Sequence, residues 1–202
     1  MVGNKPHITL QIAHSADGFI ARPGERTKLS TDASWQRVYA GREQVDAIMV
    51  GINTVMDDNP KLTSHAAKTP IRVIADTNAS IDPLSHLVLT SREIPTWLLT
   101  AQDDLMLEAM GVKLIECAVK NDRVDLQDAM QKLHNQGIKT LICEGGAMLA
   151  QSLNDEQLID ELILIESATT LGNGVALPIL SGYKPVREEK IETDTWRYYK
   201  RA

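Results

Sequence analysis

The sequence has few of the features that mark secreted, membrane or nucleic-acid-binding proteins. Its two cysteines, Cys117 and Cys143, lie in apolar runs, so we expect reduced, buried thiols rather than a disulfide framework. No apolar run approaches the roughly 20 residues that cross a bilayer, and the N-terminal residues lack a signal-peptide core. The net charge of −6 disfavours non-specific binding to nucleic acid. These absences predict a cytoplasmic protein with neither a membrane nor a nucleic-acid partner.

Motifs for metal chemistry are missing as well. The cysteines and histidines match no zinc spacing, and the adjacent acids Asp57 and Asp58 match no EF-hand, so we expect no metal site. The zinc-deaminase signature, H-x-E followed by P-C-x-x-C, does not occur, and we therefore do not expect this chain to deaminate a base.

Aromatic residues are scarce, at 4% of the chain, whereas the hydrophobic fraction is 43%, so the core must be mainly aliphatic. A length of 202 residues suits one domain, and no long linker or repeat divides it, so we treat residues 1–202 as a single domain.

Apolar runs typical of strands alternate with amphipathic, helix-like segments along the chain. This alternation predicts an α/β fold with a largely parallel, mixed sheet and helices on both faces. The last strand is expected to be antiparallel. The predicted strands cover residues 7–13, 46–51, 71–76, 96–100, 113–118, 139–143, 161–168 and 195–201. One helix is predicted to begin near Thr31, and a brief helix or turn is predicted at 54–60. Further helices are predicted at about 102–110, 125–136 and 147–155.

Ligands of such sheets bind beyond the C-terminal ends of the strands. Three polar or glycine-containing segments follow predicted strands directly, namely 51–54, 76–77 and 144–146. We expect them to share one crevice.

The segment LICEGGAMLAQSL, residues 141–153, passes from a strand to a helix through Glu144, Gly145 and Gly146. A helix N-terminus attracts anions, and glycine lets a phosphate approach the backbone closely. The G-x-G-x-x-G fingerprint is absent, so the pair of glycines alone is compatible with a plain tight turn or with a phosphate site.

Five stretches, in this order, carry a resemblance to a known family: ITLQIAHSADGFIA, REQVDAIMVGINTVMDDNPKLT, PIRVIADT, LICEGGAMLAQSL and IDELILIESATTLGNG. The chain resembles the reductase domain of the riboflavin-biosynthesis deaminase–reductase and its stand-alone archaeal and fungal counterparts. The resemblance implies a dihydrofolate-reductase-like fold, a homodimer, and NADPH-dependent reduction of the ribosyl group of a phosphoribosylamino-pyrimidine to ribityl.

The resemblance also implies roles for individual residues. Arg42, Leu62, His65 and Glu144 match substrate-binding positions, with Arg42 expected to pair with a ribose phosphate and Glu144 to accept hydrogen bonds from the pyrimidine. The candidate proton donors are Asp58, Glu144 and Asp17. The residues that match the NADPH site are Ala13, Thr54, Asp58, Thr77, Gly145, Gly146, Ala147, Met148 and Leu149.

Three positions depart from the pattern of the bacterial fused enzymes: Gln11 replaces Lys, Lys28 replaces Trp and His65 replaces Arg. Because histidine titrates near neutrality, we expect phosphate affinity to fall as the pH rises. Whether the pyrimidine ring is an aminouracil or a diaminopyrimidinone stays open. Dihydrofolate or another pteridine as the substrate, and a nucleotide-binding regulator without turnover, are the alternative interpretations.

Overall fold

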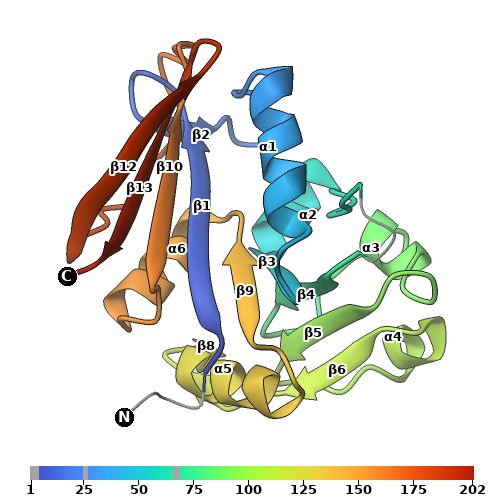
Figure 1. Ribbon diagram of the computed structural model, residues 1–202. Helices are drawn as coiled ribbons and strands as arrows, with labels where there is room; N and C mark the ends of the chain where they lie inside the picture. Colours follow the sequence, from blue (N-terminus) through green and yellow to red (C-terminus); the bar gives the residue numbers. More distant parts are fainter. Residues whose placement is uncertain (1–4, 25–26, 66–68) are drawn as a thin grey trace.

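The predicted strands assemble into one nine-stranded sheet in the order β12-β13-β10-β1-β9-β3-β4-β5-β6 (Figure 1). The computed structural model describes residues 5–24, 27–65 and 69–202. The strands of this sheet are β1 His7–His14, β3 Ala47–Gly51, β4 Ile71–Ala75, β5 Thr96–Thr100, β6 Lys113–Glu116, β9 Thr140–Cys143, β10 Glu161–Glu166, β12 Tyr183–Ile191 and β13 Asp194–Arg201. Two short ribbons stand apart from it, β2 Phe19–Ala21 with β11 Val175–Ala176, and β7 Val119–Lys120 with β8 Arg123–Val124.

The parallel character of the sheet is confirmed. Strands β1, β3, β4, β5, β6, β9 and β10 pair in parallel, whereas β13 is antiparallel to β10 and β12 is antiparallel to β13. Strand β12 was not predicted. It is a largely exposed edge strand of sequence YKPVREEKI, whose charges and Pro185 are typical of edges that resist pairing with another chain. Its register shifts between Pro185 and Arg187.

Helices cover both faces, as predicted. The helices are α1 Asp32–Arg42, α2 Ile52–Asp58, α3 His86–Leu89, α4 Leu105–Met110, α5 Leu126–Asn135 and α6 Ala147–Asp155. Leu10 and Met49 of the sheet pack with α5 and α6, while Ile48 and Ile74 pack on the other face with α2, α3 and α4. Helix α1 lies on that second face over Ile165.

The helix ends follow the signals in the sequence. The side chain of Thr31 accepts a hydrogen bond from the N–H of Ser34, which caps the N-terminus of α1. Helix α2 ends before Asn59, whose φ of 40° lies in the left-handed region just before Pro60.

The apolar run of strand β10 is compatible with an interface between subunits or with an internal strand of the sheet. It lies between β1 and β13, so both of its edges are already paired within the chain. Of the two interpretations of this apolar run, the internal strand is therefore the one that the structure supports.

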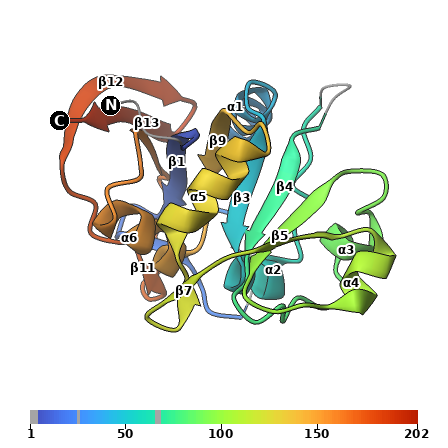
Figure 2. The same cartoon turned by 90° about the horizontal axis from the view of Figure 1, so that it is seen from below.

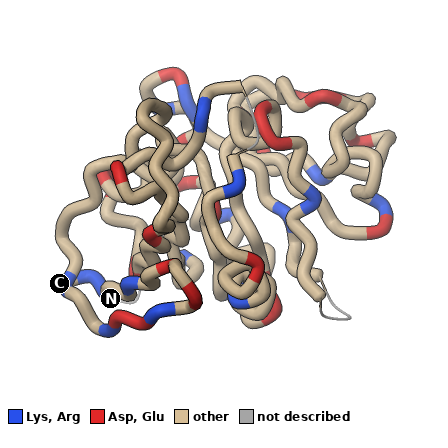
Figure 3. Tube along the Cα trace, turned by 90° about the horizontal axis from the view of Figure 1, so that it is seen from above, with Lys and Arg blue, Asp and Glu red and all other residues tan. Residues whose placement is uncertain are grey.

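Acidic and basic residues are scattered among one another along the described trace (Figure 3). Within the described ranges, every helix is too short or too polar to span a lipid bilayer. No cluster of three or more His, Cys, Asp or Glu side chains in those ranges is arranged to hold a metal ion.

Candidate active site

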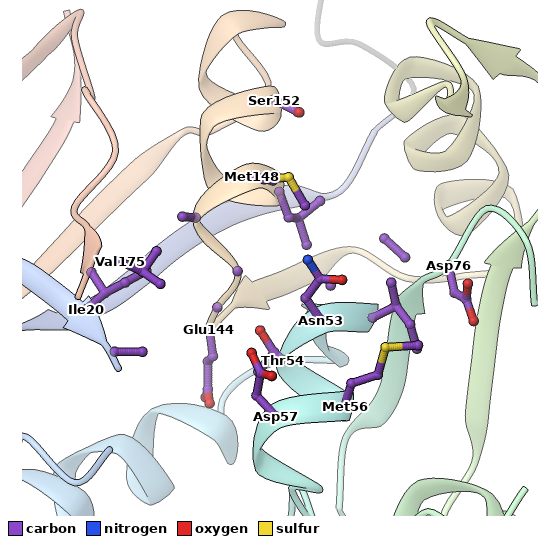
Figure 4. A pocket seen from close by; sticks show the side chains of 18 of the residues that line it. Ile20, Asn53, Thr54, Met56, Asp57, Asp76, Glu144, Met148, Ser152 and Val175 are labelled. Atoms are coloured by element: carbon purple, nitrogen blue, oxygen red, sulfur yellow. The ribbon is translucent and has the colours of Figure 1, made fainter. Parts of the chain in front are cut away.

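A cavity of about 970 Å³ opens at the C-terminal edge of the sheet. Its walls come from the three segments that were expected to converge: 51–54 after β3, 76–77 after β4 and 144–146 after β9. In the close-up, Thr54 and Asp57 of α2 point toward the same space as Glu144, and Asp76 lies at the opposite side (Figure 4). The predicted crevice is therefore a real feature of the fold.

The loop between β9 and α6 has the geometry of an anion site. Gly146 is the N-cap of α6 with φ 91°, a conformation that favours glycine, and it provides no side-chain cap. Its carbonyl accepts the first helical hydrogen bond from Ala150, so the N–H groups of residues 147–149 precede the helical ladder. A Cβ at Gly146 would lie 3.5 Å from Oγ1 of Thr54. The positive φ is what favours glycine at position 146, whereas a Cβ at either glycine would be in ordinary van der Waals contact with Thr54.

All nine predicted cofactor positions line this cavity: Ala13, Thr54, Asp58, Thr77, Gly145, Gly146, Ala147, Met148 and Leu149. Thr77 also serves the fold, because its Oγ1 accepts a hydrogen bond of 3.0 Å from the N–H of Val124. The sequence therefore located the wall of the cavity, and whether these residues bind NADPH stays a prediction.

Arg42 and Glu144 form a buried, bidentate ion pair. Nε of Arg42 donates to Oε1 at 2.8 Å and Nη2 donates to Oε2 at 2.6 Å, while Nη1 donates to the carbonyl of Thr63 at 2.7 Å. The side chains are 6% and 9% exposed. Burial alone would lower the pKa of Arg42, but the carboxylate of Glu144 outweighs that effect and raises it.

Only Glu144 of the pair lines the cavity, and the guanidinium of Arg42 donates to Glu144 and to Thr63 in this structure. The contacts of Arg42 hold the Glu144 carboxylate in place, and the pairing of Arg42 with a ribose phosphate stays a prediction. The free lone pairs of that carboxylate remain available to a ligand.

Leu62 and His65, the other predicted substrate residues, do not line the cavity. The Leu62 side chain is buried in the core with Val55, and its φ of 49° is unusual for a residue other than glycine. His65 is exposed, and its ring contacts that of Tyr39 in a tilted arrangement, with 4.1 Å between centroids and 43° between the ring planes. Substrate contact by Leu62 would therefore have to come from its backbone.

The three candidate proton donors separate in the structure. Asp58 and Glu144 line the cavity, but Asp17 does not. The carboxylate of Asp17 accepts hydrogen bonds from the N–H groups of Leu171 at 3.0 Å and Gly172 at 2.7 Å. A hydrogen bond from Ser15 and these N–H groups lower the pKa of Asp17 to about 2. Asp17 therefore ties two loops together outside the cavity lining, and a role for it as a proton donor stays an untested prediction.

The other two departures differ in their surroundings. Gln11 is 6% exposed on β1, so this amide stands at a buried position. Lys28 donates to Oδ1 of Asp32, the first residue of α1, at 2.7 Å. Neither side chain lines the cavity.

Sequence reasoning missed several parts of the cavity wall. Asp57, Ile20 and Val175 line it, the last two from the β2–β11 ribbon. Lys120 and Arg123 line it from the β7–β8 hairpin, where Asn121 and Asp122 form the turn. Strands of two residues are too short to give a hydrophobic pattern, and only the Asn-Asp pair signals a turn there.

A family model described as the RibD C-terminal domain matches residues 6–199. The chain belongs to this family. It is 33% identical over 186 residues to the 2,5-diamino-6-ribosylamino-4(3H)-pyrimidinone 5′-phosphate reductase of Methanothermobacter thermautotrophicus, covering 88% of this chain and 85% of that protein. It is 36% identical over 165 residues to the Riboflavin biosynthesis protein RibD of Actinobacillus pleuropneumoniae, covering 78% of this chain but only 44% of that longer protein.

Solved structures agree with the expected fold. RibD of Acinetobacter baumannii superposes with a TM-score of 0.86 at 23% identity, covering 100% of this chain and 59% of the other. Riboflavin Biosynthesis Reductase Rib7 of Saccharomyces cerevisiae gives 0.82 at 21% identity, covering 100% and 92%. Dihydrofolate reductase of Enterococcus faecalis gives 0.59 at 11% identity, covering 96% of each chain. The dihydrofolate-reductase-like architecture is confirmed.

Proposed function

We infer that this protein is an NADPH-dependent reductase of riboflavin biosynthesis, which converts the ribosyl group of a phosphoribosylamino-pyrimidine 5′-phosphate to a ribityl chain. The observation that carries this inference is the convergence of all nine cofactor positions on one cavity that also presents the carboxylate of Glu144. The names of the relatives support the same reaction class.

The residues present fit a dinucleotide phosphate. The first N–H groups of α6 open onto the cavity, and the two glycines before it leave the backbone uncovered beside Thr54. These groups and the positive end of the helix dipole would hold the diphosphate. When bound, NADPH supplies the hydride; the protein supplies orientation and manages protons.

Glu144 is the residue that orients the substrate. Arg42 holds both of its oxygens from one side, so the remaining lone pairs are directed in a fixed geometry. An amino-pyrimidine carries N–H donors that match these acceptors. Asp58 and Glu144 remain the candidates for moving a proton at the reacting sugar, since both lie on the cavity wall.

Pteridine reduction is the second candidate on this fold. Its only support is the architecture, because the similarity to dihydrofolate reductase is at 11% identity, whereas the matching family model is that of the riboflavin enzymes. A regulator without turnover would have no need for a fixed carboxylate in the cavity. Both alternatives therefore have less support than a reductase of riboflavin biosynthesis.

The test is to mix the protein with NADPH and, in turn, the aminouracil substrate, the diaminopyrimidinone substrate and dihydrofolate, and to follow the loss of cofactor absorbance. We expect turnover with one of the phosphoribosylamino-pyrimidines and none with dihydrofolate. Turnover of dihydrofolate alone, or of no substrate, would contradict the proposal. The Glu144→Ala variant is the control for activity from contaminating enzymes.

We further propose that the protein is cytoplasmic, where its phosphorylated substrate and NADPH would be found, and that it is a homodimer. Sedimentation equilibrium at the mass of one 22.3 kDa chain would refute the dimer.

A further inference from the structure

We propose that the β7–β8 hairpin binds the 2′-phosphate of NADPH, and that Arg123 and Lys120 make the protein select NADPH over NADH. This inference rests on the proposed function, because it takes the cavity as the cofactor site. It adds two residues that neither the motifs nor the resemblance identified.

The β7–β8 hairpin forms part of the cavity wall and is anchored to the rest of the fold. Asn121 and Asp122 have φ values of 51° and 59°, as a two-residue type I′ turn requires. The N–H of Val124 donates to Oγ1 of Thr77 at 3.0 Å, which ties the hairpin to the end of β4. Figure 2 shows β7 beside α5 and α6. The backbone of the hairpin therefore has a fixed relation to the cavity, and its exposed side chains start from fixed points.

The hairpin places two cations next to each other, an arrangement that suits an anionic ligand. Lys120 and Arg123 are direct partners across the two strands. Like charges directly opposite one another destabilise a strand pair. Lys120 forms an ion pair with Glu156, with 3.1 Å between Nζ of the lysine and Oε1 of the glutamate. Arg123 contacts only a thioether, with Nη2 3.5 Å from Sδ of Met148, and it forms no ion pair with any carboxylate in the described ranges.

Position along the cavity indicates which phosphate would bind there. Met148 stands in the first turn of α6, on the side toward Ser152 and away from Glu144 in Figure 4. If the diphosphate lies at α6 and the nicotinamide at Glu144, the adenosine half would lie toward Thr77 and the hairpin, which line the same cavity. Six carboxylates and three cations line the cavity, and two of those cations are Lys120 and Arg123. A dianionic 2′-phosphate therefore has its best counter-charges at this end, and arginine suits phosphate geometry.

The experiment measures the Kd of NADPH and of NADH by fluorescence titration for the wild type, Arg123→Ala and Lys120→Ala. Lys184→Ala, which removes a cation from β12 on the far edge of the sheet, is the matched control. We expect Arg123→Ala to weaken NADPH binding by about tenfold or more and NADH binding by less than about twofold. Lys120→Ala should give a smaller loss with the same selectivity, and Lys184→Ala should change neither Kd.

Retained NADH binding reports that the variants are folded. An equal loss for both nucleotides would overturn the inference, since it would show a contact to the shared adenosine, and so would an unchanged preference for NADPH. If the wild type turns over the pyrimidine with NADPH while Arg123→Ala keeps its preference, the inference alone fails. If the wild type binds neither nucleotide, the proposed function fails and the inference falls with it.

Discussion

The ion pair of Arg42 and Glu144 gives the most quantitative prediction. Replacing Glu144 by Gln keeps the shape of the side chain but removes its charge, and the amide can accept only one of the two hydrogen bonds that Arg42 donates. Because the side chains are 6% and 9% exposed, Arg42 would be left as a buried, uncompensated cation. Breaking such a pair costs about 3–5 kcal/mol, a large share of the roughly 5–15 kcal/mol that stabilises a typical domain.

The assay is urea unfolding followed by circular dichroism, without ligands. The matched control is Glu188→Gln, because Glu188 faces Arg197 at 2.8 Å but is 57% exposed. A pair at the surface contributes no more than about 1 kcal/mol. A double variant, Arg42→Met with Glu144→Met, should recover most of the loss, since it removes both charges together. If Glu144→Gln loses no more stability than Glu188→Gln, the account of a buried, positioning arginine is wrong.

Three further perturbations test other parts of the structure. Gly146→Val should weaken NADPH binding by roughly tenfold or more, because it places a β-branched side chain next to Thr54 at a position with φ 91°. The control is Gly137→Val, at φ 95° with no atom near its Cβ. It carries the same backbone strain without the contact and should leave the Kd for NADPH unchanged. Arg72→Met should lower the free energy of unfolding in urea by at least about 3 kcal/mol, since its guanidinium donates to the carbonyls of Leu87 in α3 and Ile94 and to the hydroxyl of Thr96. A loss below about 1 kcal/mol would contradict that role. Asp17→Asn should make the free energy of unfolding less dependent on pH below about pH 4. The pKa of Asp17 in the folded protein, about 2, lies below its unfolded value, so its stabilising effect is present above about pH 4 and is lost as the pH falls toward 2. An acid limb identical to that of the wild type would show that Asp17 contributes nothing there.

The sequence predicted those elements whose signals are local. The run from β9 through Gly146 into α6 combines a buried apolar strand, a pair of glycines and an amphipathic helix, and the structure has each in place. The cap of α1 is local in the same way, because the Thr31 side chain and the N–H of Ser34 are three positions apart. Strand β12 was missed because its alternating charges and Pro185 carry no hydrophobic pattern.

The roles of individual site residues were harder to predict because they depend on contacts across the fold. Arg42 and Glu144 are 102 positions apart, and nothing near either residue signals that they pair. Asp17 looked like a free acid after a strand, but its partners, Leu171 and Gly172, lie more than 150 positions later. Spacing along the chain predicts which strand ends converge, whereas packing decides which side chains reach the cavity.

The most direct test is a crystal structure of the protein with NADPH bound. The account predicts the diphosphate against the N–H groups that open α6 after Gly146, with the nicotinamide on the Glu144 side of the cavity. A structure with that loop vacant and the dinucleotide bound elsewhere would contradict it.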